Sequence, residues 1–157
     1  MFYSYLVLNT KQTESWGEIG HRVTAAIAEQ YLTKNTGDKI QTILNNYINN
    51  FTGQPFSSII ELSTYADDFR SQYSWSSAFH YINMPQSVIQ YSETQQCYKP
   101  FYCITKALQN YTTILRNGKV TDPFQKGQAL AFLVHLLADI YQPLHVGANF
   151  ILLLIFY

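Results

Sequence analysis

The residues with the most chemical potential lie near the end of the chain, in the segment 131–145. His135 and Asp139 are four residues apart, so on a helix they project from one face, one turn apart. Pro143 is expected to end that helix, because proline lacks a backbone N–H and restricts the residue before it. His145 lies just past this break and is expected to face the same cavity. The spacing alone leaves two interpretations open, a metal site and a core histidine that is hydrogen-bonded to an aspartate.

The rest of this segment is apolar on nearly every side, so we expect the helix to be buried. The apolar residues are Leu133, Val134, Leu136, Leu137 and Ile140. A buried carboxylate beside a buried imidazole is costly unless something pairs with both groups. A metal ion does this well.

The chain has four histidines, each in or beside an apolar stretch: His21, His80, His135 and His145. Asp67 and Asp139 add two carboxylates near them. Imidazole and carboxylate ligands without thiolates are typical of a catalytic zinc site rather than a structural one. Because the candidate ligands come from scattered segments, more than one ion is expected.

The chain that must position these residues reads as one all-helical domain with short irregular connections. It contains no internal repeat and no linker long enough to divide it. The expected helices cover residues 20–33, 39–48, 57–70, 104–115 and a last helix from 122 onward.

Local signals define several of these boundaries. The segment 35–37 should end the first helix, and Asp38 should cap the second. Asp122 should cap the last helix, with Pro123 at its first position. Residues 75–85 should cross the core as an extended segment. The apolar side of the first helix should consist of Val23, Ala26, Ile27 and Tyr31.

The composition excludes some functions and favours others. The formal net charge is zero, so tight electrostatic binding to duplex phosphates is not indicated. Charged residues make up 13% of the chain, against about 25% in typical globular proteins, which is common in secreted proteins. Residues 1–15 read as a poor or clipped signal segment. No run of residues reaches the ~18 apolar positions of a membrane-spanning helix.

Two further features depend on the compartment. Cys97 and Cys103 lie in one polar segment and either pair with each other in an oxidising compartment or await other partners. Asn50 and Asn110 each begin an N-glycosylation triplet, which is relevant only if the protein is secreted.

Five motifs occur in an order that resembles a known family. They are Trp16-Gly17-x-x-Gly20-His21, Ala66-Asp67-x-x-Arg70, Phe79-His80-Tyr81-Ile82-Asn83, Cys103-Ile104-x-x-Ala107-Leu108-x-Asn110-Tyr111-Thr112 and His135-x-x-x-Asp139-x-x-Gln142-Pro143-Leu144-His145. Together they resemble the zinc-dependent single-strand nucleases of fungi and plants, whose fold bacterial zinc phospholipase C shares. The resemblance covers residues 16 to about 147. It implies the all-α phospholipase C/nuclease-like fold, truncated to roughly its first half, with 148–157 as an unmatched apolar tail.

The resemblance implies a site for three zinc ions. The implied ligands are Trp16 and His21 for the first ion, Asp67, His80 and His135 for the second, Asp139 as a bridge between these two, and His145 for the third. Trp16 would bind through its free α-amino nitrogen and its carbonyl oxygen, which requires processing that makes it the N-terminal residue. The other ligands of the third ion belong to a later segment in the family, so about two zinc ions are expected for this chain.

The resemblance also implies the activity. Zinc lowers the pKa of a bound water to about 7, which suits hydrolysis of phosphodiester bonds in single-stranded DNA and RNA to 5′-phosphate products, with 3′-nucleotidase activity beside it. Asp67 and Asp139 would be catalytic through the metal, and Arg70 would orient a phosphate or a ligand carboxylate. Tyr81 would stack on an unpaired base. Asn83 stands where the family often has aspartate, which leaves base preference open.

Two other readings remain. One is a phospholipase C-like hydrolase on the same scaffold, and the other is a zinc-binding helical fragment that cleaves nothing. For the nuclease we expect a secreted protein or one of the endomembrane or lysosomal lumen, a monomer when complete, with single-stranded nucleic acid and nucleotides as partners.

Overall fold

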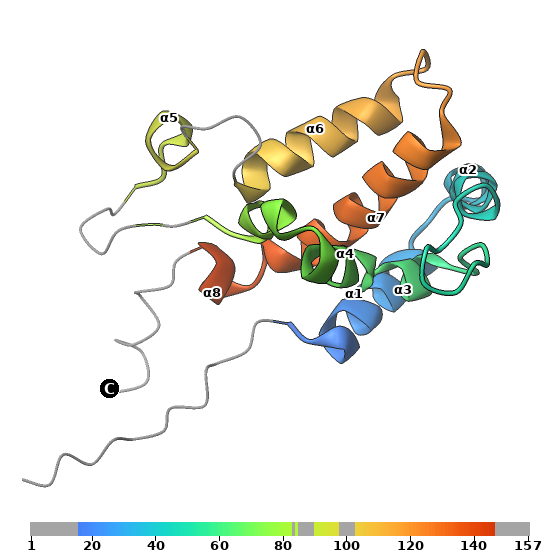
Figure 1. The fold of residues 1–157 in the computed structure, drawn as a ribbon, viewed down its shortest axis with the longest axis horizontal. Coiled ribbons are helices and arrows are strands. Elements are labelled where there is room, and N and C mark those ends of the chain that lie inside the picture. The colour runs from blue at the N-terminus through green and yellow to red at the C-terminus, as the bar shows by residue number, and fades with distance from the viewer. Residues whose placement is uncertain (1–15, 83, 85–89, 98–102, 147–157) are drawn as a thin grey trace, which may run out of the picture.

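The computed structural model describes residues 16–82, 84, 90–97 and 103–146 (Figure 1). Within these ranges the only β-pairing is an isolated bridge between Ile48 and Pro55, so the prediction of an all-α fold is confirmed. None of the described helices is long and apolar enough to cross a membrane. The elements are α1 (Glu18–Gln30), α2 (Lys34–Asn45), α3 (Ile59–Leu62), α4 (Tyr65–Gln72), the 3₁₀ helix η1 (Ser74–His80), α5 (Glu93–Gln96), α6 (Ile104–Arg116), α7 (Pro123–Asp139) and α8 (Pro143–Val146).

The longest helix, α7, is the one around which the others are arranged. It contacts α1, α2, α3, α4, η1 and α6, and Figure 1 shows α6 running alongside it. Asp122 caps α7 by accepting the backbone N–H of Phe124 at 3.0 Å, and Pro123 is its first residue, as predicted. The helix ends at Asp139, and Pro143 begins α8, so the predicted break before His145 is confirmed.

Aromatic side chains hold α4, η1 and α6 against α7. The buried ring of Phe132 on α7 stacks on Tyr111 of α6 with centroids 4.8 Å apart. The same ring makes edge contacts with Phe69 of α4 at 5.5 Å and with Phe79 of η1 at 6.1 Å. Such pairs each add about 0.5–1.5 kcal/mol beyond the burial of their area. One phenylalanine therefore fixes three elements relative to the helix that carries His135 and Asp139.

The predicted apolar side of α1 is wrong. Val23 and Ile27 are 52% and 54% exposed, and Tyr31 is also exposed, while His21 and Ala25 are the buried residues of the helix. The reason is that His21 points into the polar cluster described below and thereby sets the rotation of α1. A polar contact overrides the apolar stripe.

Two further boundaries differ from the prediction. Helix α2 begins at Lys34, because the Thr33 hydroxyl accepts the backbone N–H of Thr36 at 3.3 Å, so the segment 35–37 lies in its first turn rather than ending α1. Asp38 is therefore inside α2, where its carboxylate lies 2.7 Å from Lys34 Nζ. The expected helix 57–70 is divided into α3 and α4, with the break at residues 63–64.

The segment 75–85 was predicted to be extended, and this is wrong for its first part. Residues Ser74–His80 form η1, and the chain becomes extended only at Tyr81, with φ −149° and ψ 172°. Trp75 and Phe79 contact each other edge-on within η1, which a fully extended chain would not allow. Helix α7 is also less uniformly buried than expected, since Leu137 is 46% exposed.

Gly127 permits a close approach between α7 and the ring of Tyr47. A Cβ at this position of α7 would lie 2.0 Å from Cγ of the buried Tyr47 ring. Gly127→Ala should therefore lower the free energy of unfolding by ~1–3 kcal/mol, the usual cost of overpacking a core. Urea unfolding at fixed metal concentration measures it.

Gly37→Ala is the matched control, because nothing lies within 4 Å of a Cβ there and the residue is inside α2. It should leave stability unchanged or raise it by up to ~1 kcal/mol. If both variants unfold at the same urea concentration, the tight Tyr47–Gly127 contact is refuted.

Candidate metal centre

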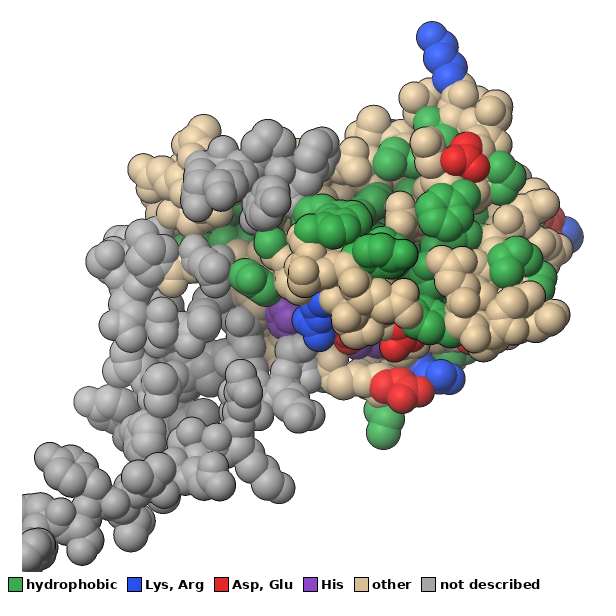
Figure 2. Space-filling view, viewed as in Figure 1, with side chains coloured by type: hydrophobic (Ala, Val, Ile, Leu, Met, Phe, Trp, Pro, Cys, Tyr) green, Lys and Arg blue, Asp and Glu red, His purple; other side chains and the backbone are tan. Residues whose placement is uncertain are grey.

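Six side chains from five elements meet at one place. They are His21 of α1, Asp67 of α4, His80 of η1, His135 and Asp139 of α7, and His145 of α8. Figure 2 shows small areas of histidine recessed between acidic and basic side chains, and the four histidines are buried. The sequence spacing that suggested a shared face for His135 and Asp139 therefore corresponds to a real contact, 3.1 Å between Nε2 and Oδ2.

Asp139 is the centre of this cluster and is 1% exposed. Its Oδ2 lies 2.9 Å from Nδ1 of His80 and 3.1 Å from Nε2 of His135. Its Oδ1 lies 3.4 Å from Nε2 of His21 and 3.6 Å from Nε2 of His145. Each oxygen thus faces its own pair of imidazoles.

Asp67 lies at the partly exposed side of the cluster. Its Oδ1 is 3.6 Å from Nε2 of His135 and 3.8 Å from Nδ1 of His80. Arg70, one turn along α4, places Nη2 3.0 Å from the same oxygen, so the predicted shared face is confirmed. The guanidinium offsets part of the negative charge where the cluster meets solvent.

Two of the imidazoles are oriented by backbone carbonyls. His135 donates from Nδ1 to the carbonyl of Ser63 at 2.7 Å, and His145 donates from Nδ1 to the carbonyl of His80 at 2.5 Å. Both rings therefore direct Nε2 toward the carboxylates. A second partner of this kind is common for metal-binding histidines, because it fixes the tautomer and the ring orientation.

The Ser63 carbonyl is available because the helix is broken there. The backbone N–H groups of Asp67 and Asp68 both donate to the carbonyl of Thr64, so neither of them donates to the carbonyl of Ser63. Sequence reasoning missed both carbonyl acceptors. A backbone group carries no signal in residue type, and the break at residues 63–64 was not foreseen.

Burial and charge together set the pKa values. Burial, with the neighbouring His135, lowers the pKa of His21 to about 4, and burial also lowers the pKa of His80. Burial acts to lower the pKa of His135 too, but the hydrogen bond and charge of Asp139 outweigh it and raise the pKa. For Asp139, burial acts to raise the pKa, and the hydrogen bonds of His135 and His80 prevail and hold it well below its ordinary value. An ionised carboxylate beside the imidazoles of His21 and His80, whose lowered pKa values favour the neutral form, offers ligand atoms to a cation.

Several buried atoms of the cluster have no hydrogen-bond partner within the described part of the chain. They are Nδ1 and Nε2 of His21, Nε2 of His80, Oδ1 of Asp139 and Nε2 of His145. An unsatisfied buried polar atom costs about 1–3 kcal/mol, so five of them need an explanation. A core histidine paired with an aspartate would account for the contact between His135 and Asp139 only.

A cation between these groups would satisfy most of them. Two sets of three residues offer ligand atoms that all lie within 4.8 Å of one another: His21, His135 and Asp139, and Asp67, His80 and His135. Nitrogen and carboxylate donors without thiolates suit zinc in an open, catalytic type of site. The residues present therefore fit zinc, and His135 stands between the two sets.

The other predicted site residues lie around the cluster, except for Asn83, which is not among the residues that the structure describes. Trp16 lies just before α1, with its ring against Gly20. Tyr81 directly follows His80 and is 36% exposed. Asn50 is exposed, whereas Asn110 is half-buried within α6.

The model of the S1/P1 nuclease family matches residues 16–152, and the chain therefore belongs to this family. Among its relatives, "Nuclease S1" of Aspergillus oryzae is 31% identical over 140 residues, which are 85% of this chain and 45% of that protein. "Endonuclease 2" of Arabidopsis thaliana is 30% identical over 154 residues, covering 91% of this chain and 49% of the relative. "Endonuclease 1" of the same plant is 27% identical over 151 residues, covering 90% and 47%. The chain spans about half the length of these relatives.

Proposed function

We propose that this chain carries the zinc-binding part of a nuclease that hydrolyses phosphodiester bonds in single-stranded DNA and RNA and leaves 5′ phosphates, with 3′-nucleotidase activity at the same site. The observation that supports it most is the buried Asp139 with an imidazole pair facing each of its oxygens. The relatives named as nucleases support the same reading. The whole enzyme is proposed to act as a monomer.

The proposed ligands follow the two sides of Asp139. Oδ1 with His21, and with the α-amino nitrogen and carbonyl of a processed Trp16, would hold one ion. Oδ2 with His80, His135 and Asp67 would hold a second. His145 would contribute to a third. The separate surroundings of Oδ1 and Oδ2 favour a bridging carboxylate over a single shared ion.

When bound, zinc supplies a Lewis acid and an ionised water near neutral pH. The chain's own residues have three other tasks. Asp139 and Asp67 keep negative charge at the centre of the site, so that cations stay close together. Arg70 holds Asp67 by its 3.0 Å contact and presents its remaining N–H groups, which suit a phosphate. Asp67 and Arg70 are partly exposed, so the cluster meets solvent on their side.

Tyr81 is proposed to stack on a base of the substrate. It directly follows the ligand His80, and its ring is exposed enough to accept a flat partner. A base must be unpaired to stack there, which would explain a preference for single strands. Asn83 is proposed to contact the same base.

We further propose that the protein acts in an oxidising compartment, secreted or in an endomembrane or lysosomal lumen. The described structure joins Cys97 and Cys103 in a disulfide, which is typical of such compartments. Asn50, which is exposed, is the more accessible of the two proposed glycan acceptors.

The first test is zinc content. His135→Ala should remove most of the bound zinc, because His135 belongs to both ligand sets. Leu137→Ala, two residues away and exposed, is the control and should keep it. Elemental analysis of monomeric, folded protein gives the stoichiometry, expected near two per parent chain. Equal zinc in parent and His135→Ala would exclude His135 as a ligand.

The second test concerns the amino terminus. A protein that begins at Trp16 should bind more zinc than one that begins at Ser15, because one added residue turns the α-amino ligand into an amide. Both forms keep every side chain of the described site, so fold and charge are closely matched. Equal zinc binding by the two forms would mean that the Trp16 amine is not a ligand.

The third test separates base recognition from the metal chemistry. Tyr81→Ala should raise KM for single-stranded DNA by an amount worth ~1–3 kcal/mol, with kcat little changed. Tyr31→Ala is the control, because Tyr31 is an exposed tyrosine that directly follows α1.

A phosphodiester without a nucleobase should be cleaved equally by parent and Tyr81→Ala. If Tyr81→Ala impairs cleavage of that substrate as much as cleavage of DNA, Tyr81 acts on the metal site and the stacking role is wrong. Cleavage of a choline phospholipid but not of DNA by the parent would favour the phospholipase C-like alternative.

A further inference from the structure

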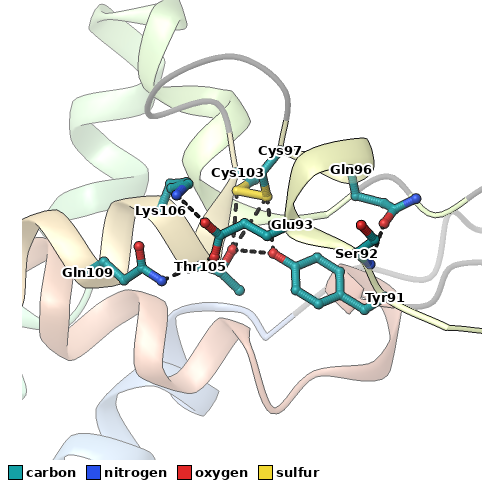
Figure 3. The surroundings of a disulfide bond; sticks show 9 residues. All are labelled: Tyr91, Ser92, Glu93, Gln96, Cys97, Cys103, Thr105, Lys106 and Gln109. Atoms are coloured by element: carbon teal, nitrogen blue, oxygen red, sulfur yellow. Dashed lines mark hydrogen bonds and ion pairs between the residues drawn. A yellow bond between two sulfur atoms is a disulfide. The ribbon is translucent and has the colours of Figure 1, made fainter.

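The Cys97–Cys103 disulfide lies immediately before α6 and is packed into a small polar cluster (Figure 3). Thr105 Oγ1 lies 3.4 Å and 3.3 Å from the two sulfurs and 2.7 Å from the Tyr91 hydroxyl. Glu93 pairs with Lys106 in the first turn of α6. These contacts tie the start of α6 to α5, and both cysteines are buried.

The start of α6 is linked to the metal centre by three consecutive hydrogen bonds. The N–H of Ile104, directly after Cys103, donates to the carbonyl of Tyr81 at 3.2 Å. The N–H of Ile82 donates to the carbonyl of His145 at 2.7 Å. The ring of His145 donates from Nδ1 to the carbonyl of His80 at 2.5 Å. The segment 80–82, in which η1 passes into extended chain at Tyr81, is thus held on one side by α6 and on the other by α8.

The hydrogen bonds from α6 lead to only some of the proposed ligands. His21, His135 and Asp139 are placed by α1 and α7, and the packing of α7 on Phe69 and Tyr111 does not involve the disulfide. His145 lies on α8, a helix of four residues, and its ring and backbone both bond to the segment 80–82. Its position therefore depends on that segment more than any other ligand does.

We propose that the Cys97–Cys103 disulfide is a positioning element of the metal centre, which holds His145 and His80 in place through the segment 80–82. This rests on the proposed zinc site. Reduction by a dithiol transfers two electrons and two protons to the disulfide, which yields two thiols and an oxidised dithiol. The start of α6 then keeps only its polar contacts with Tyr91 and Glu93, and the hydrogen bond from Ile104 to Tyr81 should weaken.

The first experiment needs no metal. Backbone hydrogen exchange is measured in zinc-free parent and in the double variant Cys97→Ala/Cys103→Ala. Exchange at Ile82 and Ile104 should become faster than the loss of global stability accounts for. Gly127→Ala supplies the comparison at similar stability, since it disturbs the packing of Tyr47 away from this segment. If Ile82 and Ile104 exchange alike in the two variants, the disulfide only stabilises the fold and the proposal fails.

The second experiment uses zinc and cobalt. Competition with a chromophoric chelator should show zinc affinity about 10–100-fold lower in the double cysteine variant, the usual range when an outer partner of a ligand is lost. The absorption spectrum of the Co²⁺ form should change as well. Gly127→Ala should keep both the affinity and the spectrum.

A double-mutant cycle with His145→Ala completes the test. If the disulfide acts through His145, the cysteine substitutions should cost little additional affinity in the His145→Ala background. Full additivity would overturn the proposed route. If the parent and the double cysteine variant bind zinc equally well, this inference is refuted while the proposed function stands. A parent that binds no zinc refutes the proposed function, and the exchange experiment still decides whether the disulfide holds segment 80–82.

Discussion

The structure depends on one buried carboxylate, that of Asp139. An isolated ionised carboxylate in a protein interior is costly, and here four imidazoles approach its two oxygens at 2.9–3.6 Å. Those imidazoles come from α1, η1, α7 and α8, so satisfying the single charge requires four separate segments to meet. Aromatic packing around Phe132 holds η1, together with α4 and α6, against α7. The aromatic packing and the site thus lie along one face of the same helix, because Phe132, His135 and Asp139 follow one another at spacings of three and four residues.

The breaks after α3 and after η1 can be explained by the hydrogen bonds that their backbone carbonyls accept. A continuous helix through residues 63–64 would use the Ser63 carbonyl internally, and His135 would then lose the acceptor that orients its ring. A regular helix continuing through Tyr81 would similarly leave no extended carbonyl for Ile104. Both irregularities provide hydrogen-bond acceptors to groups that support the site.

The sequence predicted some elements well for identifiable physical reasons. Asp122 and Pro123 are local signals that act on the next few residues, so the start of α7 could be placed correctly. Spacing of four residues likewise predicts contact between His135 and Asp139 on any helix. The start of α2 was misplaced, because Thr33 and Asp38 are both good caps and only the tertiary structure shows which one is used. The contacts of His21 and His80 with residues of α7 join positions that are far apart in the sequence, and only the family resemblance indicated them.

The rotation of α1 shows most clearly which interaction prevails when signals conflict. Its apolar residues recur at the spacing of a core-facing stripe, yet Val23 and Ile27 are exposed and His21 is buried. Turning the helix to bury the stripe would remove His21 from Asp139 and leave only the imidazole of His145 near Oδ1. Burying the side chains of Val23 and Ile27 would stabilise the folded state by about 1.5–3 kcal/mol each. The helix keeps its polar orientation, with the ring of His21 stacked on that of His135 at a centroid distance of 3.7 Å. This indicates that the contacts of the centre fix α1 more strongly than its own hydrophobic pattern does. Departures of this kind are expected at functional sites, where a local rule gives way to the geometry that the chemistry needs.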